Sequence, residues 1–285
     1  MELVEKYFGY DDGKGTAAEG NFRISASQVS RFFDTTSQWY REQLLGEDGF
    51  TGNTASELGN CVHAAAAMQT ELGHVAYETI DAYIGSLDPI EFDTDHIRAQ
   101  YPLMVDVLLS FLEQNPSAEA EKFIYHEILP GIGAGGSIDA LCGDRVVNED
   151  GTITYTGEVT IRDWKTTSAL SPPNKFSRNY WFQQMVYSWV LKQLGITVSK
   201  IQLVYITQSV TGRVSEKTGK PLKDYPSQIS VVTEEVTESS LELIGSCLHL
   251  IAESVQTWNT KPELRHLLAQ DLRLKTHKIP KFINQ

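Results

Sequence analysis

Helical spacing of apolar residues dominates the first part of the chain. Apolar positions recur every three or four residues across residues 22–115, which predicts an all-helical region. We expect its first helix to open near Ile24, where Ser25 and Gln28 match a capping box ahead of an apolar stripe. Residues 1–21 are polar and rich in glycine, and this composition predicts a loose lead-in.

The rest of the helical region divides at glycine and proline positions. A loop over residues 47–54 precedes a helical stretch over residues 55–87, with a break predicted near Gly73. Residues 94–114 predict a further helix, interrupted or bent at Pro102 because proline removes a backbone hydrogen bond. The pattern therefore predicts several helices in succession.

After residue 115 the pattern changes to short apolar runs of strand composition. Residues 131–136 predict a glycine-rich hairpin turn, and residues 148–151 predict a second hairpin. The predicted strands cover residues 123–129, 137–142, 152–164, 201–206 and 229–233, and the helices among them cover 177–194 and 238–258. This order predicts an α/β fold of the α+β kind, a mixed sheet flanked by helices.

These elements predict one domain over residues 22–285, which follows the lead-in. Its helical part is residues 22–115, its core of sheet and helices is residues 116–260, and residues 261–285 form a basic C-terminal segment. Hydrophobic residues make up 41% of the 285 residues, which is enough for a sizeable core. No apolar run approaches the roughly 20 residues of a membrane span, and the start of the chain lacks a secretory signal pattern. We expect a cytoplasmic protein that does not enter a membrane.

The charge is acidic overall but uneven. A net charge of -13 argues against a broad phosphate-binding surface. The stretch from Arg273 to Lys281 is nevertheless basic and contains no acidic residue. It is either a solvated tail or a DNA contact, with Lys275 and Lys278 as the candidate contacts.

Two short segments carry the candidate chemistry. Asp139 begins one predicted strand, and Asp163 and Lys165 lie at the end of the next. Residues two apart on a strand share a face, so the carboxylate and the ammonium are expected side by side. In isolation, such a pair is better explained as an exposed ion pair at a sheet edge.

Taken together, Asp139 and the later Asp-Trp-Lys segment resemble the PD-(D/E)XK nuclease superfamily. The likeness is greatest to the branch with RecB-type nuclease domains, Cas4-like proteins and phage recombination exonucleases. It extends to the helix that opens near Ile24, to a Gly-x-x-x-His segment ending at His63, and to a Gln-x-x-x-Tyr segment ending at Tyr187. Ile138 stands where the family name places a proline. Each motif is weak alone, and their shared order is the specific signal.

The resemblance implies a restriction-endonuclease-like core with an N-terminal helical region. It implies a Mg²⁺- or Mn²⁺-dependent deoxyribonuclease, best described as an exonuclease that acts on DNA ends in recombination or repair. Its setting would be the cytoplasm of a bacterium or of a phage-infected host, with a single-strand annealing protein or a separate helicase as partner. Two alternatives stay open: a structure-specific or flap endonuclease of the same fold, and a catalytically silent DNA-binding or assembly module.

The resemblance also implies a set of metal ligands. Asp139 and Asp163 are the expected carboxylate ligands, and the Trp164 carbonyl adds a backbone oxygen. His63 matches the position of an additional ligand, although a lone helical histidine is more often structural. Glu127, on the strand before Asp139, is expected near the metal, although it also fits a solvent-facing position.

Other residues are expected to act on the substrate. Lys165 would orient or activate the attacking water, or offset phosphate charge, and a nearby metal would depress its pKa. Gln183 and Tyr187 share a helix face, so Gln183 would contact a catalytic carboxylate or the cleaved strand while Tyr187 supports it; packing against the sheet explains them equally well. Thr166 and Thr167 are candidate phosphate contacts, or simply end the strand.

The aromatic run from Tyr180 to Phe182 is expected either to stack on single-stranded bases or to pack in the core. The cysteines argue against an iron–sulfur cluster. Cys61, Cys142 and Cys247 are scattered along the chain, and three thiolates cannot supply a four-thiolate site.

Overall fold

The computed structural model describes residues 2–9, 21–45, 52–149, 152–212, 214, 218–221, 223–261 and 264. Its helices are α1 (Glu2–Phe8), α2 (Val29–Asp34), α3 (Thr36–Leu44), α4 (Thr54–Leu72), α5 (Tyr77–Ser86), α6 (Thr94–Gln114), α7 (Arg178–Gln193) and α8 (Glu238–Thr260), with a 3-10 turn η1 (Ala26–Gln28). Its strands are β1 (Phe22–Ser25), β2 (Glu119–Leu129), β3 (Ile132–Cys142), β4 (Arg145–Val147), β5 (Ile153–Tyr155), β6 (Val159–Thr167), β7 (Val198–Thr207) and β8 (Ile229–Glu235).

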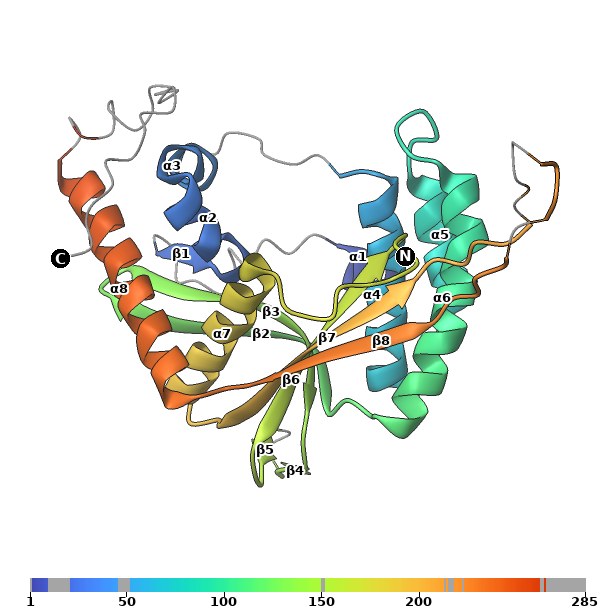
Figure 1. Ribbon diagram of the computed structural model, residues 1–285. Coiled ribbons are helices and arrows are strands. Elements are labelled where there is room, and N and C mark those ends of the chain that lie inside the picture. The colour runs from blue at the N-terminus through green and yellow to red at the C-terminus, as the bar shows by residue number, and fades with distance from the viewer. Residues whose placement is uncertain are drawn as a thin grey trace.

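A mixed six-stranded sheet forms the middle of the molecule (Figure 1). The long strand β3 pairs with antiparallel β2 along one edge; on its other edge it pairs with parallel β1 near its start and with antiparallel β6 near its end. Strands β6 and β7 are parallel and are connected through α7, and β8 closes the sheet antiparallel to β7. The short strands β4 and β5 form a separate hairpin. The predicted mixed sheet flanked by helices is confirmed.

Helices cover both faces of this sheet and create two hydrophobic cores (Figure 1). Helices α2, α3, α7 and α8 pack on one face, and α4, α5 and α6 pack on the other. Strand β6 contributes to both cores because alternate side chains point to opposite faces: Ile161 joins the first core and Trp164 the second. The sheet therefore holds the end of β6 between α4 and α7.

Local signals in the sequence account for the long helices. The side chain of Asn53 accepts a hydrogen bond from the Ser56 amide at the start of α4, and the helix ends at Gly73, whose φ of 76° suits glycine. The predicted break near Gly73 is confirmed. The predicted helix over residues 94–114 is also confirmed as α6, which continues through Pro102 without interruption.

Three predictions near the N-terminus and in the first hairpin are wrong. Residues 22–25 form β1 and pair with β3, and the Ser25 side chain makes no capping hydrogen bond. Part of the expected lead-in, residues 2–8, is the helix α1. Residues 132–136 belong to β3 and not to a turn, and the glycines at 133 and 135 let β2 lie against them, since a side chain at either would meet the β2 backbone. A non-local pairing decides these segments, so local composition misjudged them.

The expected strand over residues 152–164 is two strands, β5 and β6. Parts of the predicted loop at 47–54 and of the hairpin at 148–151 lie outside the described residues, as does the basic stretch with Lys275 and Lys278.

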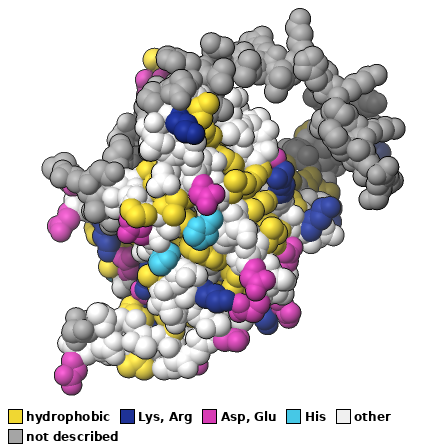
Figure 2. Space-filling view, turned by 90° about the vertical axis from the view of Figure 1, so that its left-hand side faces the viewer, with side chains coloured by type: hydrophobic (Ala, Val, Ile, Leu, Met, Phe, Trp, Pro, Cys, Tyr) yellow, Lys and Arg dark blue, Asp and Glu magenta, His cyan; other side chains and the backbone are white. Residues whose placement is uncertain are grey.

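The surface on the α8 side carries apolar, acidic and basic side chains in a mixed pattern (Figure 2). In this view the described residues form no continuous basic stripe of the kind that binds a run of phosphates. Among the described helices, none combines the length and the apolar character that crossing a membrane requires.

Candidate active site

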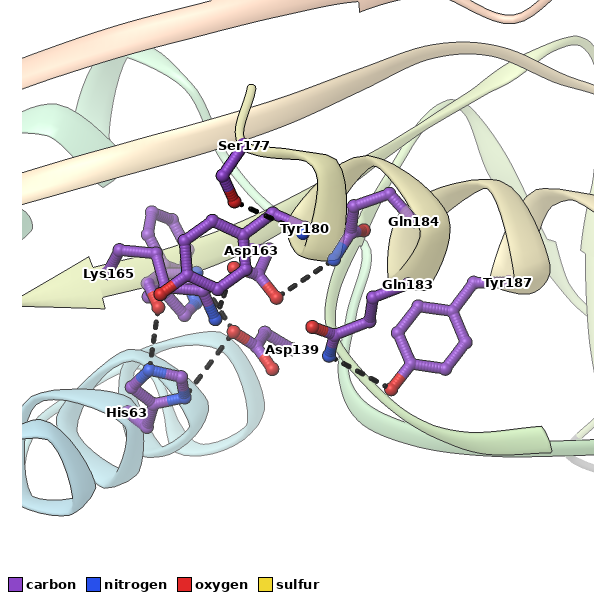
Figure 3. A network of polar contacts seen from close by, with 10 residues as sticks. His63, Asp139, Asp163, Lys165, Ser177, Tyr180, Gln183, Gln184 and Tyr187 are labelled. Carbon is purple, nitrogen blue, oxygen red and sulfur yellow. Dashed lines mark hydrogen bonds and ion pairs between the residues drawn. The ribbon is translucent and has the colours of Figure 1, made fainter. Parts of the chain in front are cut away.

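Polar side chains from α4, β3, β6 and α7 meet where these elements converge (Figure 3). Asp139 lies on β3, and Asp163 and Lys165 lie on β6, as the sequence predicts. His63 approaches from α4, and Gln184 approaches from α7 on the other side. Residues far apart in the sequence thus form one polar group between two apolar cores.

Asp163 is buried and held by two partners. Its side chain is about 2% exposed, and Oδ1 accepts a hydrogen bond of 2.9 Å from Gln184 Nε2. Oδ2 lies 2.5 Å from Lys165 Nζ in an ion pair whose geometry is not that of a regular hydrogen bond. The predicted shared strand face of Asp163 and Lys165 is therefore present, but the pair is buried and not at an exposed edge.

Burial and neighbouring charges shift the pKa values of both groups of this pair. Burial raises the pKa of Asp163 to about 6, against the opposing effect of the Lys165 ammonium. Burial alone would lower the pKa of Lys165, but the carboxylates of Asp163 and Asp139 outweigh it and raise the pKa above its usual value. In the absence of a metal ion, Lys165 is therefore a charged ammonium; the depressed pKa expected beside a bound metal stays a prediction.

Asp139, His63 and Trp164 form the part of the site that faces α4. The Trp164 amide donates to Asp139 Oδ2 over 2.9 Å, which ties β3 to β6. His63 Nε2 lies 2.8 Å from the Trp164 carbonyl oxygen, and His63 Nδ1 lies 3.4 Å from Asp139 Oδ2. Helix α4 can approach β6 this closely because Gly59, one turn before His63, faces the Thr166 hydroxyl.

Glu121 completes this part of the site. It lies on β2 between Ala120, which pairs with Ala140, and Lys122, which pairs with Ile138, so it stands opposite Asp139. The ligand atoms of His63, Glu121 and Asp139 all lie within 4.8 Å of one another. We call these three residues the ligand cluster.

Two properties of Glu121 are unusual for a strand residue. Its φ of 46° is the one positive value among the described residues other than glycine, and such a conformation costs about 1–3 kcal/mol. Glu121 is exposed, but its position beside the sheet partly desolvates its carboxyl group and raises the pKa of Glu121 to about 8. The nearby carboxylates of Asp139 and Asp163 raise it further. Repulsion of this kind is relieved when a cation binds among the carboxylates.

Glu127 was predicted near the metal, and this prediction is wrong. Its Oε1 accepts a hydrogen bond of 2.6 Å from the Gly131 amide, so it supports the turn between β2 and β3. The residue is opposite Gly133, six residues along β3 from Asp139. The register of β2 against β3 brings Glu121, and not Glu127, to the site.

The contact of α7 with the carboxylates is made by Gln184 instead of Gln183. Gln184 is fully buried and donates to Asp163, whereas Gln183 Nε2 lies 3.4 Å from the Tyr187 hydroxyl. Tyr187 is buried and packs against Gly136, where a Cβ atom would lie 3.1 Å from the Tyr187 hydroxyl oxygen. The expected support of Gln183 by Tyr187 is present, but the expected carboxylate contact is not.

The remaining candidates border the site less directly. The Thr167 hydroxyl accepts from the Ala169 amide and so ends β6, and the Thr166 hydroxyl faces α4. The Tyr180 ring lies 4.9 Å from Lys165 Nζ, whereas Phe182 packs against Trp181 and Phe33. Tyr180 thus covers the ammonium, and its two neighbours in the chain pack against the first core.

The donor set of the ligand cluster suits a divalent cation. It offers one imidazole and two carboxylates, and the Trp164 carbonyl lies beside them. Hard cations such as Mg²⁺ bind carboxylate oxygens, and an imidazole extends the set to Mn²⁺. Asp163 lies next to this cluster, with its oxygens directed to Gln184 and Lys165.

Two residues of the site were missed in the sequence. Glu121 gave no signal because it adjoins other charged residues, Glu119 and Lys122, in a polar stretch. Gln184 gave no signal because the Gln-x-x-x-Tyr spacing selects Gln183. Its burial distinguishes Gln184 from Gln183, and burial is known only from the tertiary structure.

Comparison with known proteins places this geometry in a family. A model of the PD-(D/E)XK nuclease superfamily matches residues 23–260. Among solved structures, the chain is similar to a candidate exonuclease from Eubacterium rectale, with 12% identity and a TM-score of 0.50; the match covers 86% of this chain and 84% of that one. No curated protein sequence matches the chain.

Two structures of the alkaline exonuclease LHK-Exo from Laribacter hongkongensis are more distant. The first has 12% identity and a TM-score of 0.39, over 89% of this chain and 99% of that one. The second, a complex with dAMP, has 14% identity and a TM-score of 0.33, over 75% and 97%. At these TM-scores they add nothing to the fold assignment. The family model covers most of the chain, and the mixed sheet with its N-terminal helices agrees with a restriction-endonuclease-like core, so the chain belongs to the PD-(D/E)XK nuclease superfamily.

Proposed function

We propose that this protein is a Mg²⁺- or Mn²⁺-dependent deoxyribonuclease that removes nucleotides from DNA ends. The observation that carries the proposal is the convergence of His63, Glu121 and Asp139 beside the buried Asp163–Lys165 pair. Family membership supports phosphodiester hydrolysis as the reaction. The ligand chemistry supports a divalent cation as the cofactor.

Hydrolysis of a phosphodiester needs a water nucleophile and relief of negative charge at phosphorus. A divalent metal held in the ligand cluster would supply both kinds of chemistry, activation of the water and neutralisation of phosphate charge. His63, Glu121 and Asp139 would hold the metal, and the Trp164 carbonyl and Asp163 are further candidate ligands.

Lys165 supplies a fixed positive charge at the same place. Its ammonium is held by Asp163 and covered by the Tyr180 ring, so its position is determined before substrate arrives. An ammonium in this position donates a hydrogen bond to the attacking water or to a phosphate oxygen. Gln184 keeps Asp163 turned towards Lys165 and therefore acts as a positioning residue.

The resemblance in fold to the candidate exonuclease from Eubacterium rectale favours exonuclease action over internal cleavage. From the resemblance of the sequence motifs, we propose a role in DNA recombination or repair in a bacterial or phage-infected cytoplasm, with a separate helicase or a single-strand annealing protein as partner. We also propose that Thr166, Thr167, Lys275 and Lys278 contact phosphates of the DNA substrate.

The deciding experiment uses end-labelled linear DNA and covalently closed circular DNA, each with Mg²⁺, with Mn²⁺ and with chelator. We expect release of short products from linear DNA only, and only with metal. Cleavage of the circular substrate would identify an endonuclease. No cleavage of either substrate, with DNA binding retained, would identify a catalytically silent binding module.

A further inference from the structure

A cavity of about 490 Å³ opens directly beside the ligand cluster. His63 and Glu121, two of the three cluster residues, lie in its wall. The other walls come from α1, α4, β2 and β3. A group bound in this cavity would adjoin a phosphate held at the cluster.

Half-buried aromatic rings with a cation beside each occur on two walls of the cavity. On α1, Lys6 Nζ lies 4.9 Å from the centre of the Tyr7 ring. On the sheet, Phe123 lies in the wall, and the Arg23 guanidinium, which does not line the cavity, lies 5.5 Å from the centre of its ring. Rings that accept bases, combined with cations that accept phosphates, are the usual components of sites for single-stranded nucleic acid.

Helix α1 is held in place as part of this wall. The Tyr7 hydroxyl donates to Glu71 on α4 over 2.9 Å, and Lys6 forms an ion pair with the same carboxylate. Phe8 stacks on Tyr83 of α5 at 3.9 Å between ring centres. These contacts give the aromatic wall a defined position relative to the ligand cluster.

The α4 wall leaves room for a ligand. Ala64 and Ala67 are one helical turn apart and present only methyl groups to the cavity. Asn60 and Ser137 add hydrogen-bonding groups at its edge. The volume falls in the range of pockets that take one small organic molecule, such as a nucleotide, and is too small for a length of duplex.

We propose that this cavity binds a nucleotide of single-stranded DNA next to the phosphate that is cleaved, with its base against Tyr7 or Phe123 and its backbone near Lys6. The inference rests on the proposed nuclease function and extends it to the strand that the site accepts. A base can offer its face to a ring only when it is free of its neighbours in the duplex. The site therefore takes single-stranded or frayed ends.

The test uses binding and not cleavage. A short single-stranded oligonucleotide with 2-aminopurine at successive positions is titrated with the protein in Ca²⁺, because stacking on a ring quenches 2-aminopurine fluorescence. We expect quenching at one or two adjacent positions with the natural chain. Tyr7→Ala and Phe123→Leu should weaken binding about tenfold and lose the quenching, since one stacked base contributes on that scale.

Matched variants separate stacking from support of α1. Tyr7→Phe keeps the ring and removes the hydrogen bond to Glu71, so it should retain the quenching. Lys6→Ala should weaken binding and reduce its salt dependence. Its control is Lys192→Ala, which removes a similar ion pair between helices, with Glu238, at a different surface hollow. Melting curves confirm that each variant is folded.

Quenching that persists in folded Tyr7→Ala and Phe123→Leu overturns the inference. Equal loss in Tyr7→Phe and Tyr7→Ala also overturns it, since the effect would then come from the support of α1. Tighter binding of blunt duplex than of single-stranded DNA, with no quenching, would also overturn the inference. Failure of the natural chain to cleave any DNA in Mg²⁺ is a separate result and counts against the proposed function.

Discussion

The two sides of the site differ in how their polar groups are held. On the β6–α7 side, the Asp163 side chain is about 2% exposed and both its oxygens face protein partners. On the β3–α4 side, His63 and Asp139 have side chains about 28% and 14% exposed, and Glu121 is repelled by its neighbours. The charged groups on the β6–α7 side are thus paired within the protein, whereas the carboxylates on the β3–α4 side repel each other and favour binding of a cation.

This difference suggests a division of work. Groups that are fixed before substrate binds spend no free energy on orientation during the reaction, which suits Lys165. Groups that repel each other until a cation arrives favour metal binding, which suits the ligand cluster. Changes on the β6–α7 side should therefore affect cleavage most, and changes on the β3–α4 side should affect metal affinity most.

Substitutions in the buried Asp163–Lys165 pair should have the largest effect, which is a loss of cleavage rate. Lys165→Ala and Asp163→Ala should each reduce the rate of DNA cleavage by about a thousandfold or more, since the first removes the positive charge placed for the transition state and the second removes the carboxylate that holds it. Asp163→Asn, which keeps an acceptor for Gln184, tests the same point with less disturbance of packing. Rates are measured at saturating Mg²⁺ on variants with two-state melting. Substantial activity in a folded variant would contradict the division of work.

The next largest effect is on metal affinity, and it distinguishes Glu121 from Glu127, two glutamates of β2. Glu121→Gln should weaken Mn²⁺ binding at least about tenfold, by analogy with the loss of groups around metal sites. Glu127→Gln is the matched control, because Glu127 is held in the turn at Gly131. Calorimetric titration of both variants decides the point. Equal weakening by the two changes would remove Glu121 from the ligand cluster.

A third prediction distinguishes two neighbouring glutamines. Gln184→Leu should lower the free energy of unfolding by about 1.5–3 kcal/mol, because a buried carboxylate loses a hydrogen bond, and it should also slow cleavage. Gln183→Leu should cost less than about 1 kcal/mol, because its partner is the neutral Tyr187 hydroxyl at 3.4 Å. Denaturant melts at neutral pH measure both. The reverse order would mean that α7 faces the sheet through Gln183.

His63 sharpens the comparison through metal identity. His63→Ala should reduce Mn²⁺ affinity more than Mg²⁺ affinity, because nitrogen ligands favour Mn²⁺. Calorimetry with each ion, together with a melting curve, measures both effects. A lower melting temperature with unchanged metal affinities would make His63 a structural bridge to the Trp164 carbonyl and not a ligand.

The smallest expected effect is on the strain at Glu121. Glycine tolerates a φ of 46°, so Glu121→Gly should be more stable without metal than Glu121→Ala by about 1 kcal/mol. Both variants should bind metal equally poorly. Equal stability in thermal melts without metal would show that the backbone relaxes when the carboxylate is removed.

Much of the fold follows from the sequence by itself. Regular apolar spacing over many turns predicted α6 and α8 within a few residues, and the distance of two along one strand placed Asp163 and Lys165 on one face. The ordered motifs predicted the family, which the family model confirms. These features are local, or depend only on order along the chain, so they can be recognised without coordinates.

Only the tertiary structure decided which glutamate and which glutamine reach the site, and what α1 does. Glu121 rather than Glu127 stands opposite Asp139 because of the register between β2 and β3. Gln183 and Gln184 differ by about 100° around their helix, so the rotation of α7 against the sheet selects one of them. Helix α1 is too short to be stable alone, and it exists through contacts with α4 and α5. Strand register, helix rotation and long-range contact are relations between segments, and a single segment of sequence does not encode them.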